Sequence, residues 1–424
     1  MDVNNLTSAA AAALKRRRLT LALFCLINFT TGALYVWSVF SSALAAHLTA
    51  LTGTPVTHQS LGYIFGIASG VTPFMMIAGG WVNDRFGPKA VIGAGGALIG
   101  AGYLLAAGAK TPFELMLFYG FGVGIGTGLV NGCTINTAVK LFPDRRGFAG
   151  GLVTASLGIG AAVLPFAATG LIDLLGITET LRLFGLASGL LIVPAALMTV
   201  RCPAGFAQEL CPSSETGRSV GPDMNWVQMI RTRTFWPLAM LFMTSALMGL
   251  MLLSSVSGIA QAQIGLSAGA AALAVSVISL ANTAGRFLSG TISDRFGRVE
   301  TLSIGLVSAL LGLTLLALSG EGDLLAFFAG LAGVGLCFGG FIGIYPSLVA
   351  DEYGPTHNSV NFSILMLGYS VGGLVGPALL KATAPYGFSF AYFVCMGIAV
   401  AGLGFAALFK WMKSERLCPS YFSR

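Results

Sequence analysis

The chain has 424 residues, of which 55% are hydrophobic and only 9% are charged. Soluble domains carry about 25% charged residues, so this composition excludes a soluble enzyme and a disordered or fibrous protein. The net charge of +7 does not indicate nucleic-acid binding, because Lys and Arg sit at the edges of apolar runs and form no patch with interleaved aromatics. The sequence therefore predicts a protein that crosses a membrane many times.

Apolar runs of roughly 20 residues, the length that an α-helix needs to cross a bilayer, recur along the whole chain. Divided at Gly, Pro and charge clusters, they predict an all-α membrane protein with twelve transmembrane helices. The expected ranges are 19–46, 60–83, 88–109, 113–140, 147–172, 181–200, 234–262, 268–293, 299–319, 325–350, 359–381 and 388–411.

The longest polar break separates six predicted helices from six. We therefore expect an N-terminal six-helix bundle over 1–200, a cytoplasmic linker over 201–233 and a C-terminal six-helix bundle over 234–424. Within the linker, residues 225–231 are expected to form a short amphipathic helix.

Basic residues near the helix ends predict the orientation, because Lys and Arg accumulate on the cytoplasmic side. With a cytoplasmic N-terminus, 19 of the 23 Lys and Arg fall on that side and three fall on the other. Both termini are therefore expected in the cytoplasm. The basic edges favour a bacterial inner (plasma) membrane, with a eukaryotic plasma membrane as the alternative.

Two loops, each after the second predicted helix of its half, carry nearly the same sequence. Gly80, Asp84, Arg85 and Gly87 of the first loop recur 210 residues later in the second, as Gly290, Asp294, Arg295 and Gly297. A carboxylate is stabilised at a helix end by the helix dipole and nearby Arg, and glycine permits a tight turn and close helix contact. The two loops indicate an internal repeat of six helices.

With these loops the chain resembles the major facilitator superfamily, although Pro88 replaces the first terminal basic residue of that family's signature. The resemblance covers the whole chain. It implies two pseudo-symmetric six-helix bundles, a binding site near the midplane and transport by alternating access. It also implies that Asp84, Arg85, Asp294 and Arg295 gate the cytoplasmic side and do not bind substrate.

Arg286 is the one charged residue predicted inside the membrane. It precedes Asp294 by eight residues, which places it ~12 Å deeper than the loop. A charge at that depth costs roughly 2.5 kcal/mol or more and usually faces a cavity. No acidic residue or histidine is expected there, so the guanidinium is predicted to bind a carboxylate, whose two oxygens match its planar fork. The alternative is a structural strut bonded to helix carbonyls.

Polar side chains at helical spacing surround Arg286 on four predicted helices. Several such stripes indicate a shared aqueous path, although Ser and Thr also serve as interhelical contacts in membranes. The stripes are Asn28, Thr31, Tyr35 and Ser38; Thr127, Asn131 and Thr134; Ser276, Ser279, Asn282, Thr283 and Ser289; and Asn361 and Tyr369.

Five segments resemble the oxalate/formate antiporter family, with the bacterial pyruvate:proton transporter as the closest likeness and animal monocarboxylate transporters as more distant relatives. The segments are 32–38, 141–147, 282–286, 338–340 and 345–347. The resemblance implies that Arg286 binds the substrate carboxylate. It also implies a second cation in oxalate carriers, a Lys on helix 11, at the position that Tyr369 occupies here.

One fixed positive charge suits one carboxylate, because an oxalate dianion would leave a second negative charge uncompensated in a site of low dielectric. We therefore expect a small monocarboxylate such as pyruvate, lactate or formate, with an oxalate/formate-type exchanger as the alternative.

Aromatic residues are expected to form a collar around a small, partly apolar ligand. They are Tyr35, Trp37, Phe338, Tyr345 and Tyr369, of which Trp37 and Phe338 fit a core or lipid-facing position equally well. Asn131 and Asn282 complete the expected substrate-binding set.

The sequence does not show which ion or anion drives transport of the substrate. Animal monocarboxylate transporters resemble this chain but are thought to carry a buried acid beside the helix 8 Arg, and residues 280–283 contain none. A proton therefore travels on the substrate or on a loop group, or else the protein exchanges a counter-anion. We expect a monomer in the lipid bilayer, with no cofactor, no metal and no nucleic-acid partner.

Three rival functions remain. An exporter of another small metabolite on the same fold is suggested by the glycine-rich segment 372–377. A carboxylate sensor that does not transport is disfavoured by short loops. A membrane enzyme is disfavoured because the sequence has no metal cluster, nucleophile–base pair or phosphate loop.

Overall fold

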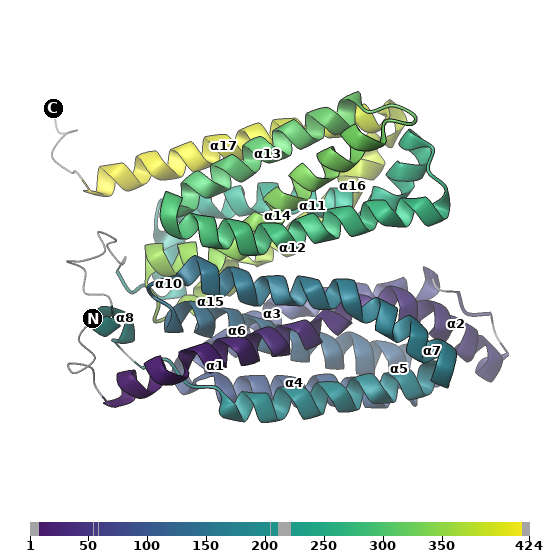
Figure 1. Ribbon diagram of the computed structural model, residues 1–424, viewed down its shortest axis with the longest axis horizontal. Coiled ribbons are helices and arrows are strands. Elements are labelled where there is room, and N and C mark those ends of the chain that lie inside the picture. The colour runs from purple at the N-terminus through teal and green to yellow at the C-terminus, as the bar shows by residue number, and fades with distance from the viewer. Residues whose placement is uncertain (1–7, 54, 58, 204, 211–221, 418–424) are drawn as a thin grey trace.

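The computed structural model describes residues 8–53, 55–57, 59–203, 205–210 and 222–417. Within these residues the regular structure is helical, so the predicted all-α class is confirmed. The N-terminal helices form one body and the C-terminal helices a second body beside it, drawn below and above in Figure 1. Ser8 and the end of the last helix lie at one end of the molecule, which we call the termini end; the opposite end is the far end.

The N-terminal half contains six transmembrane segments. The first is continuous from α1 (Ser8–Thr31) through a 3₁₀ segment, η2 (Gly32–Val36), to α2 (Trp37–Thr52). The fourth combines α5 (Pro112–Leu115), a π-helical stretch, η4 (Met116–Val123), and α6 (Gly124–Leu141). The others are α3 (Gly62–Phe86), α4 (Pro88–Ala106) and α7 (Arg146–Met198), which supplies two segments.

The C-terminal half repeats this arrangement after two short helices, α8 (Phe206–Leu210) and α10 (Trp226–Arg231). The α10 helix confirms the predicted amphipathic helix, and Asn225 and Gln228 cap its start reciprocally. The long helices are α11 (Phe235–Ile264), α12 (Ala268–Phe296), α13 (Arg298–Leu318), α14 (Leu324–Tyr353), α15 (Asn358–Leu365), α16 (Leu367–Thr383) and α17 (Phe388–Leu417).

Ten of the described helical segments are long and apolar enough to cross a membrane. The α7 helix provides two spans, because the chain turns at Gly176, whose φ of 78° suits glycine. The α12 helix, which contains Arg286, is not among the ten. Together these segments account for the twelve predicted helices.

Two boundaries differ from the sequence prediction for physical reasons. The predicted helices 147–172 and 181–200 are separated by the single glycine turn at Gly176 and not by a loop. The predicted helix 359–381 is divided at Met366, where the N–H of Tyr369 donates to the carbonyl of Met366, three residues back, and tightens the chain. Interrupted helices are characteristic of transporter binding sites.

Glycines on α6 bring its backbone against neighbouring helices and do not line an open surface. A Cβ on Gly124 would stand 2.7 Å from the backbone of Ala68, and one on Gly126 would stand 2.6 Å from the carbonyl of Gly95. Small residues permit such close packing in membranes. These glycines of α6 therefore serve helix packing.

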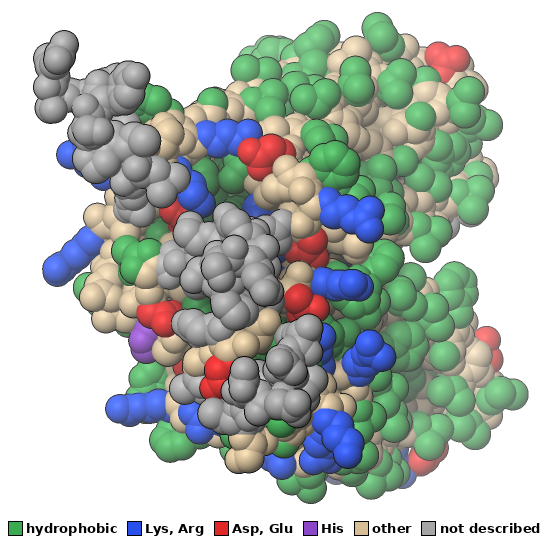
Figure 2. Space-filling model, turned by 60° about the vertical axis from the view of Figure 1, so that its left-hand side comes forward, with side chains coloured by type: hydrophobic (Ala, Val, Ile, Leu, Met, Phe, Trp, Pro, Cys, Tyr) green, Lys and Arg blue, Asp and Glu red, His purple; other side chains and the backbone are tan. Residues whose placement is uncertain are grey.

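Charged side chains gather on the termini end, whereas the flanks of the molecule are hydrophobic (Figure 2). Polar ends and apolar flanks are what a bilayer-spanning bundle requires. The low charge content of the sequence therefore corresponds to a structure whose charged residues lie at its end and whose flanks are apolar.

Candidate functional site

The α12 helix places Arg286 between the two halves. Its backbone carbonyl lies against Gly151 of α7 on one side and Gly343 of α14 on the other. A Cβ on Gly151 would stand 2.5 Å from that oxygen, and one on Gly343 would overlap it. Glycine at both positions therefore allows α12 to sit at the depth where its arginine reaches the other half.

The guanidinium of Arg286 is held by two neutral acceptors. Its Nε donates to Oδ1 of Asn282, one turn earlier on α12, at 2.9 Å. Its Nη1 donates to the carbonyl oxygen of Thr154 on α7, in the N-terminal half, at 3.1 Å. Among the described residues no carboxylate forms an ion pair with it. An arginine has five N–H donors, so three remain on the Nη1/Nη2 edge.

Two tyrosines from interrupted helices approach this guanidinium. Tyr35 lies on η2 and Tyr369 follows the break between α15 and α16. Both phenols lie close enough to Arg286 to interact with its charge, and they lie near each other. Phe338 stacks on Tyr369, with ring centroids 6.1 Å apart and 15° between the planes. Tyr35 is 40% exposed, and Arg286 and Tyr369 are partly accessible, so the group is not sealed in a core.

Three other predicted site residues have structural contacts. Tyr345 is fully buried and donates its hydroxyl to the carbonyl of Leu238 at 2.8 Å. Trp37 is 4% exposed and packs on Tyr119 at 4.4 Å between ring centroids. Asn131 accepts a hydrogen bond from Thr31 at 3.0 Å. The structure thus brings Arg286, Asn282, Tyr35, Tyr369 and Phe338 together, and it engages the hydroxyl of Tyr345 and the ring of Trp37 elsewhere.

The polar stripes on helices 1 and 4 face each other. Besides Thr31 and Asn131, Asn28 donates to Thr134 at 2.7 Å. Asn361 is placed at the termini end, where its amide donates to the carbonyl of Met224. These pairs are interhelical contacts in this conformation, and the shared aqueous path along these helices stays a prediction.

The repeat glycines bring the halves together at the termini end. A Cβ on Gly80 would stand 2.9 Å from the backbone carbon of Ser359, at the start of α15. Gly290 of the second copy approaches Gly147, at the start of α7, more closely still. The same glycine of each repeat thus packs against the first turn of a helix from the opposite half.

The second copy adds a carboxylate cap across the halves. Asp294 accepts hydrogen bonds from the backbone N–H groups of Gly147 at 2.9 Å and Phe148 at 2.8 Å. These N–H groups belong to the first turn of α7, where the helix dipole favours a negative charge. Asp294 therefore binds the halves together through the backbone of the other half.

Two arginines close this contact into a ring. Arg298 donates to Asp294 at 2.7 Å and to Asp351 at 2.9 Å. Asp351 in turn accepts from Arg146, which begins α7, at 2.6 Å. Both links between the halves therefore end on the first turn of α7, and charge-assisted bonds of this kind are about twice as strong as neutral ones.

The first copy binds differently. Lys140 of α6 donates to Asp84 at 2.6 Å and to the carbonyl of Thr356, in the C-terminal half, at 3.0 Å. The second oxygen of Asp84 has no hydrogen-bond partner among the described residues. Asn358 also crosses the halves, donating to Asn136 at 2.7 Å. The termini end is thus closed by contacts from both copies, although only Asp294 caps a helix.

The two repeat arginines point to the surface. Arg85 is exposed, with its guanidinium 5.1 Å from the centroid of the Trp81 ring. Arg295 is exposed and forms no ion pair with the described residues. Their gating role stays a prediction, whereas the carboxylates of the same motif lie in the contact between the halves.

Sequence reasoning missed several residues of this contact. Arg146, Asp351 and Lys140 lie at predicted helix ends, where charged residues are common and give no sign of their partners. Thr154 was missed because it contributes a carbonyl, which every residue has. The available signal was their position in the sequence. Each of the three charged residues lies in the first or last turn of a helix, next to a loop.

The closed end contains a half-buried thiol, Cys202, just beyond the last N-terminal span. Burial raises the pKa of this thiol to about 11, although the nearby charges of Lys140, Arg146 and Arg201 act in the opposite direction. The thiol is therefore protonated at neutral pH and is no nucleophile.

We predict that Asp351→Asn weakens the closed end. Removing the bridging charge leaves Arg146 and Arg298 facing each other without their shared carboxylate. Charged hydrogen bonds contribute ~1.5–3 kcal/mol, so amide exchange in the first turn of α7 should accelerate by roughly tenfold or more. Hydrogen-exchange mass spectrometry checks this.

The control for that experiment is Glu179→Gln, which breaks the exposed Arg182–Glu179 pair beside the Gly176 turn. It should leave exchange in the first turn of α7 unchanged. Unaltered exchange there in Asp351→Asn would show that the ion-pair ring does not hold the two halves together.

The family model described as Major Facilitator Superfamily matches residues 19–261 and 245–417. An Escherichia coli protein described as an uncharacterized MFS-type transporter, YhjX, is 32% identical over 85% of this chain and 86% of its own length. The oxalate:formate antiporter of Oxalobacter formigenes is 29% identical over 89% of this chain and 86% of its own.

A solved structure of the E. coli fucose:proton symporter FucP, in the outward conformation, superposes with a TM-score of 0.68 at 17% identity. The match covers 92% of this chain and 98% of FucP, and it supports the fold. The relatives are transporters, so the prediction of a transporter and not an enzyme is confirmed. The chain belongs to the major facilitator superfamily.

Proposed function

We propose that the protein is a secondary active transporter that moves a small monocarboxylate, of the pyruvate, lactate or formate type, by alternating access. The observation that carries this proposal is the state of Arg286. Its charge lies between the two halves, its two partners are an amide and a carbonyl, and no described carboxylate neutralises it. An anionic guest would supply the missing countercharge.

The occupied donors indicate how a carboxylate would bind. Because Nε is taken by Asn282 and one Nη1 hydrogen by Thr154, the open edge of the fork is Nη1/Nη2. A bidentate carboxylate fits such an edge. The Nδ2 group of Asn282 is buried without a partner among the described residues and offers a further donor. Tyr35 and Tyr369 supply hydroxyls, and Phe338 supplies an apolar face for a methyl group.

Charge matching favours a monocarboxylate over oxalate. The site holds one fixed cation, and Tyr369 stands where the resemblance to oxalate carriers implies a second one. The name of the relative at 29% identity supports a small organic anion as substrate but names a dianion and a monoanion together. The alternatives are therefore an oxalate/formate-type exchanger or an exporter of another small metabolite on this fold.

For orientation we propose that the termini end is cytoplasmic, with the protein in a bacterial inner membrane and acting as a monomer. The basic side chains on that end support this orientation. The linker 201–233 then lies in the cytoplasm between bundles 1–200 and 234–424. Because the contacts at the termini end are formed and Tyr35 is 40% exposed, the conformation described is best assigned as open toward the opposite side.

The partners of Arg286 favour exchange of anions over a proton relay through the protein. Neither the Asn282 amide nor the Thr154 carbonyl titrates, so neither can carry a proton. When the empty carrier changes conformation, the charge of Arg286 is enclosed without a counterion. In the loaded carrier the bound carboxylate neutralises that charge. Return of the empty carrier is therefore expected to be slow.

We predict that Arg286→Gln abolishes most transport of labelled pyruvate into reconstituted vesicles. Loss of ~3 kcal/mol of charge-assisted bonding corresponds to roughly a hundredfold decrease in uptake. Arg286→Lys keeps the charge but not the fork, so an intermediate decrease is expected. The control is Arg182→Gln, an exposed arginine paired with Glu179. Equal uptake by wild type and Arg286→Gln would remove the central role of this residue.

We predict that Tyr369→Lys shifts selectivity toward oxalate. A second cation beside Arg286 would compensate the second carboxylate, so oxalate should compete with pyruvate at least tenfold better than in the wild type, a change of ~1.4 kcal/mol. Competition by unlabelled pyruvate, lactate, formate and oxalate measures this, with Tyr386→Lys at an exposed position as control. Oxalate outcompeting pyruvate and lactate in the wild type would contradict a monocarboxylate carrier.

We predict that internal anion accelerates uptake. Vesicles preloaded with unlabelled pyruvate should take up labelled pyruvate about tenfold faster than empty vesicles at equal pH on both sides, because the loaded carrier avoids crossing with a bare charge. Empty vesicles that accumulate pyruvate as fast under an inward proton gradient, with no effect of preloading, would instead assign proton symport.

A further inference from the structure

A pocket of about 610 Å³ lies at the termini end of the C-terminal half, apart from the contact between the halves. It is formed by α10, the turn into α11 and the last part of α17. Its lining residues are Gln228, Arg231, Thr232, Arg233, Thr234, Trp411 and Met412. The transport proposal assigns it no role.

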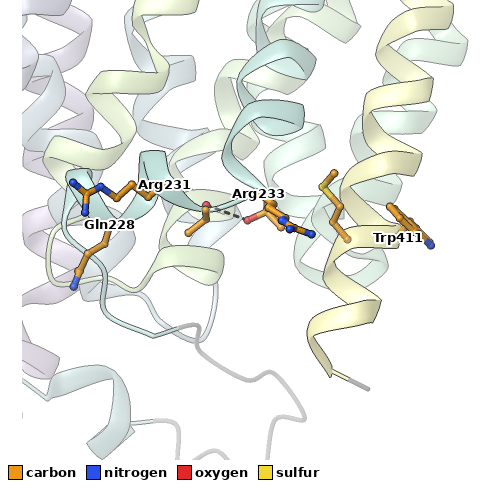
Figure 3. A pocket seen from close by; sticks show the side chains of 7 residues that line it. Gln228, Arg231, Arg233 and Trp411 are labelled. Atoms are coloured by element: carbon orange, nitrogen blue, oxygen red, sulfur yellow. Dashed lines mark hydrogen bonds between the residues drawn. The ribbon is translucent and has the colours of Figure 1, made fainter. Parts of the chain in front are cut away.

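Figure 3 shows how the pocket is divided. Arg233 extends from the start of α11 toward Trp411 on α17, whereas Gln228 and Arg231 lie on the opposite side, at α10. Arg233 and Trp411 thus line the same pocket from α11 and α17. A pocket lined by an arginine and an aromatic ring suits a group that has both a charge and an apolar body.

The guanidinium groups of this pocket lack anionic partners. Neither Arg231 nor Arg233 forms an ion pair with a described residue, although both are exposed. The lysines that flank Trp411 on α17 are different, because Lys410 pairs with Glu300 at 3.0 Å and Lys413 with Glu352 at 2.6 Å. The pocket therefore carries positive charge that no described residue compensates by an ion pair.

The tryptophans place this pocket at the level of the lipid headgroups. Of the five tryptophans in the chain, four are 49–56% exposed, namely Trp81, Trp226, Trp236 and Trp411. They lie near helix ends at the termini end, and exposed tryptophan concentrates where hydrocarbon meets water. Trp411 lines the pocket itself, so its opening faces the headgroup layer.

We propose that this pocket binds the phosphate of an anionic phospholipid, with the phosphate on Arg233 and the indole of Trp411 against the glycerol backbone. Basic pockets between transmembrane helices commonly take such headgroups. The ligand chemistry is a phosphate ester, and a lipid is the source favoured because the opening lies at the membrane surface. The proposal depends on the membrane location of the protein and not on the role of Arg286.

Native mass spectrometry of the full-length protein, titrated with phosphatidylglycerol or phosphatidylcholine, tests the proposal. Each Lys or Arg near an anionic surface strengthens the binding of anionic lipid. Arg233→Gln should therefore weaken binding of the first phosphatidylglycerol about fivefold. Arg233→Lys should retain part of the affinity. The matched control is Arg16→Gln, an exposed arginine on α1 at the same end but outside the pocket.

Three results would overturn the proposal. An equal loss in Arg233→Gln and Arg16→Gln would indicate diffuse attraction between the basic end and anionic lipid. Displacement of the lipid by a millimolar excess of glycerol 3-phosphate would indicate a site for a soluble phosphate ester. Equal affinity for phosphatidylglycerol and phosphatidylcholine in the wild type would show that the uncompensated arginine does not select the ligand.

Discussion

An ionised guanidinium between the two halves of a membrane-spanning bundle is the constraint on which the arrangement of this protein depends. A charge in that position is costly unless polar groups solvate it, and here the groups provided are neutral: the side chain of Asn282 and the backbone of Thr154. Neutral partners orient the fork without cancelling its charge. The same contacts that make Arg286 tolerable in the interior therefore leave it able to attract an anion.

The helix pair α7 and α12 connects this charge to the closed end of the molecule. Along α7 the residues that meet α12 recur at helical spacing: Gly147 lies on Gly290, Gly151 on the carbonyl of Arg286, and Gly158 on Thr283. Thr154, on the same face, accepts the bond from Arg286. Arg286 and the Asp294 cap thus lie along one tightly packed interface between the same two helices.

Much of this could be predicted from the sequence, because the relevant signals are local. The apolar run lengths predicted the spans, the repeated Gly-x-x-x-Asp motif predicted the two halves, and the isolation of Arg286 indicated the candidate site. Tyr35 and Tyr369 could also be predicted as part of the candidate site, because helical spacing places them on the polar faces of their helices. The single-glycine turn at Gly176 could not be predicted, since glycine is frequent throughout such a chain.

Pairings between distant segments could not be predicted in the same way. Arg146 and Asp351 are 205 residues apart, and nothing near either residue reveals the other. Tyr345 resembled a binding-site residue by its motif, yet its hydroxyl is satisfied by the carbonyl of Leu238 in the core of the C-terminal half. Asn28 and Thr134 lie in two separate predicted polar stripes, and neither stripe revealed that they hydrogen-bond to each other. A polar side chain in a membrane helix bonds to its nearest acceptor, and that neighbour is set by the tertiary packing.

The central claim is that a carboxylate sits on the open edge of Arg286, and a distance measurement tests it most directly. Solid-state NMR on protein with ¹⁵N-labelled arginine and pyruvate ¹³C-labelled at the carboxylate would report the carbon–nitrogen separation. The account predicts a contact of about 4 Å in the wild type, as expected for a bidentate pair, that disappears in Arg286→Lys. Dephasing that persists in Arg286→Lys would mean that the substrate carboxylate binds to another arginine.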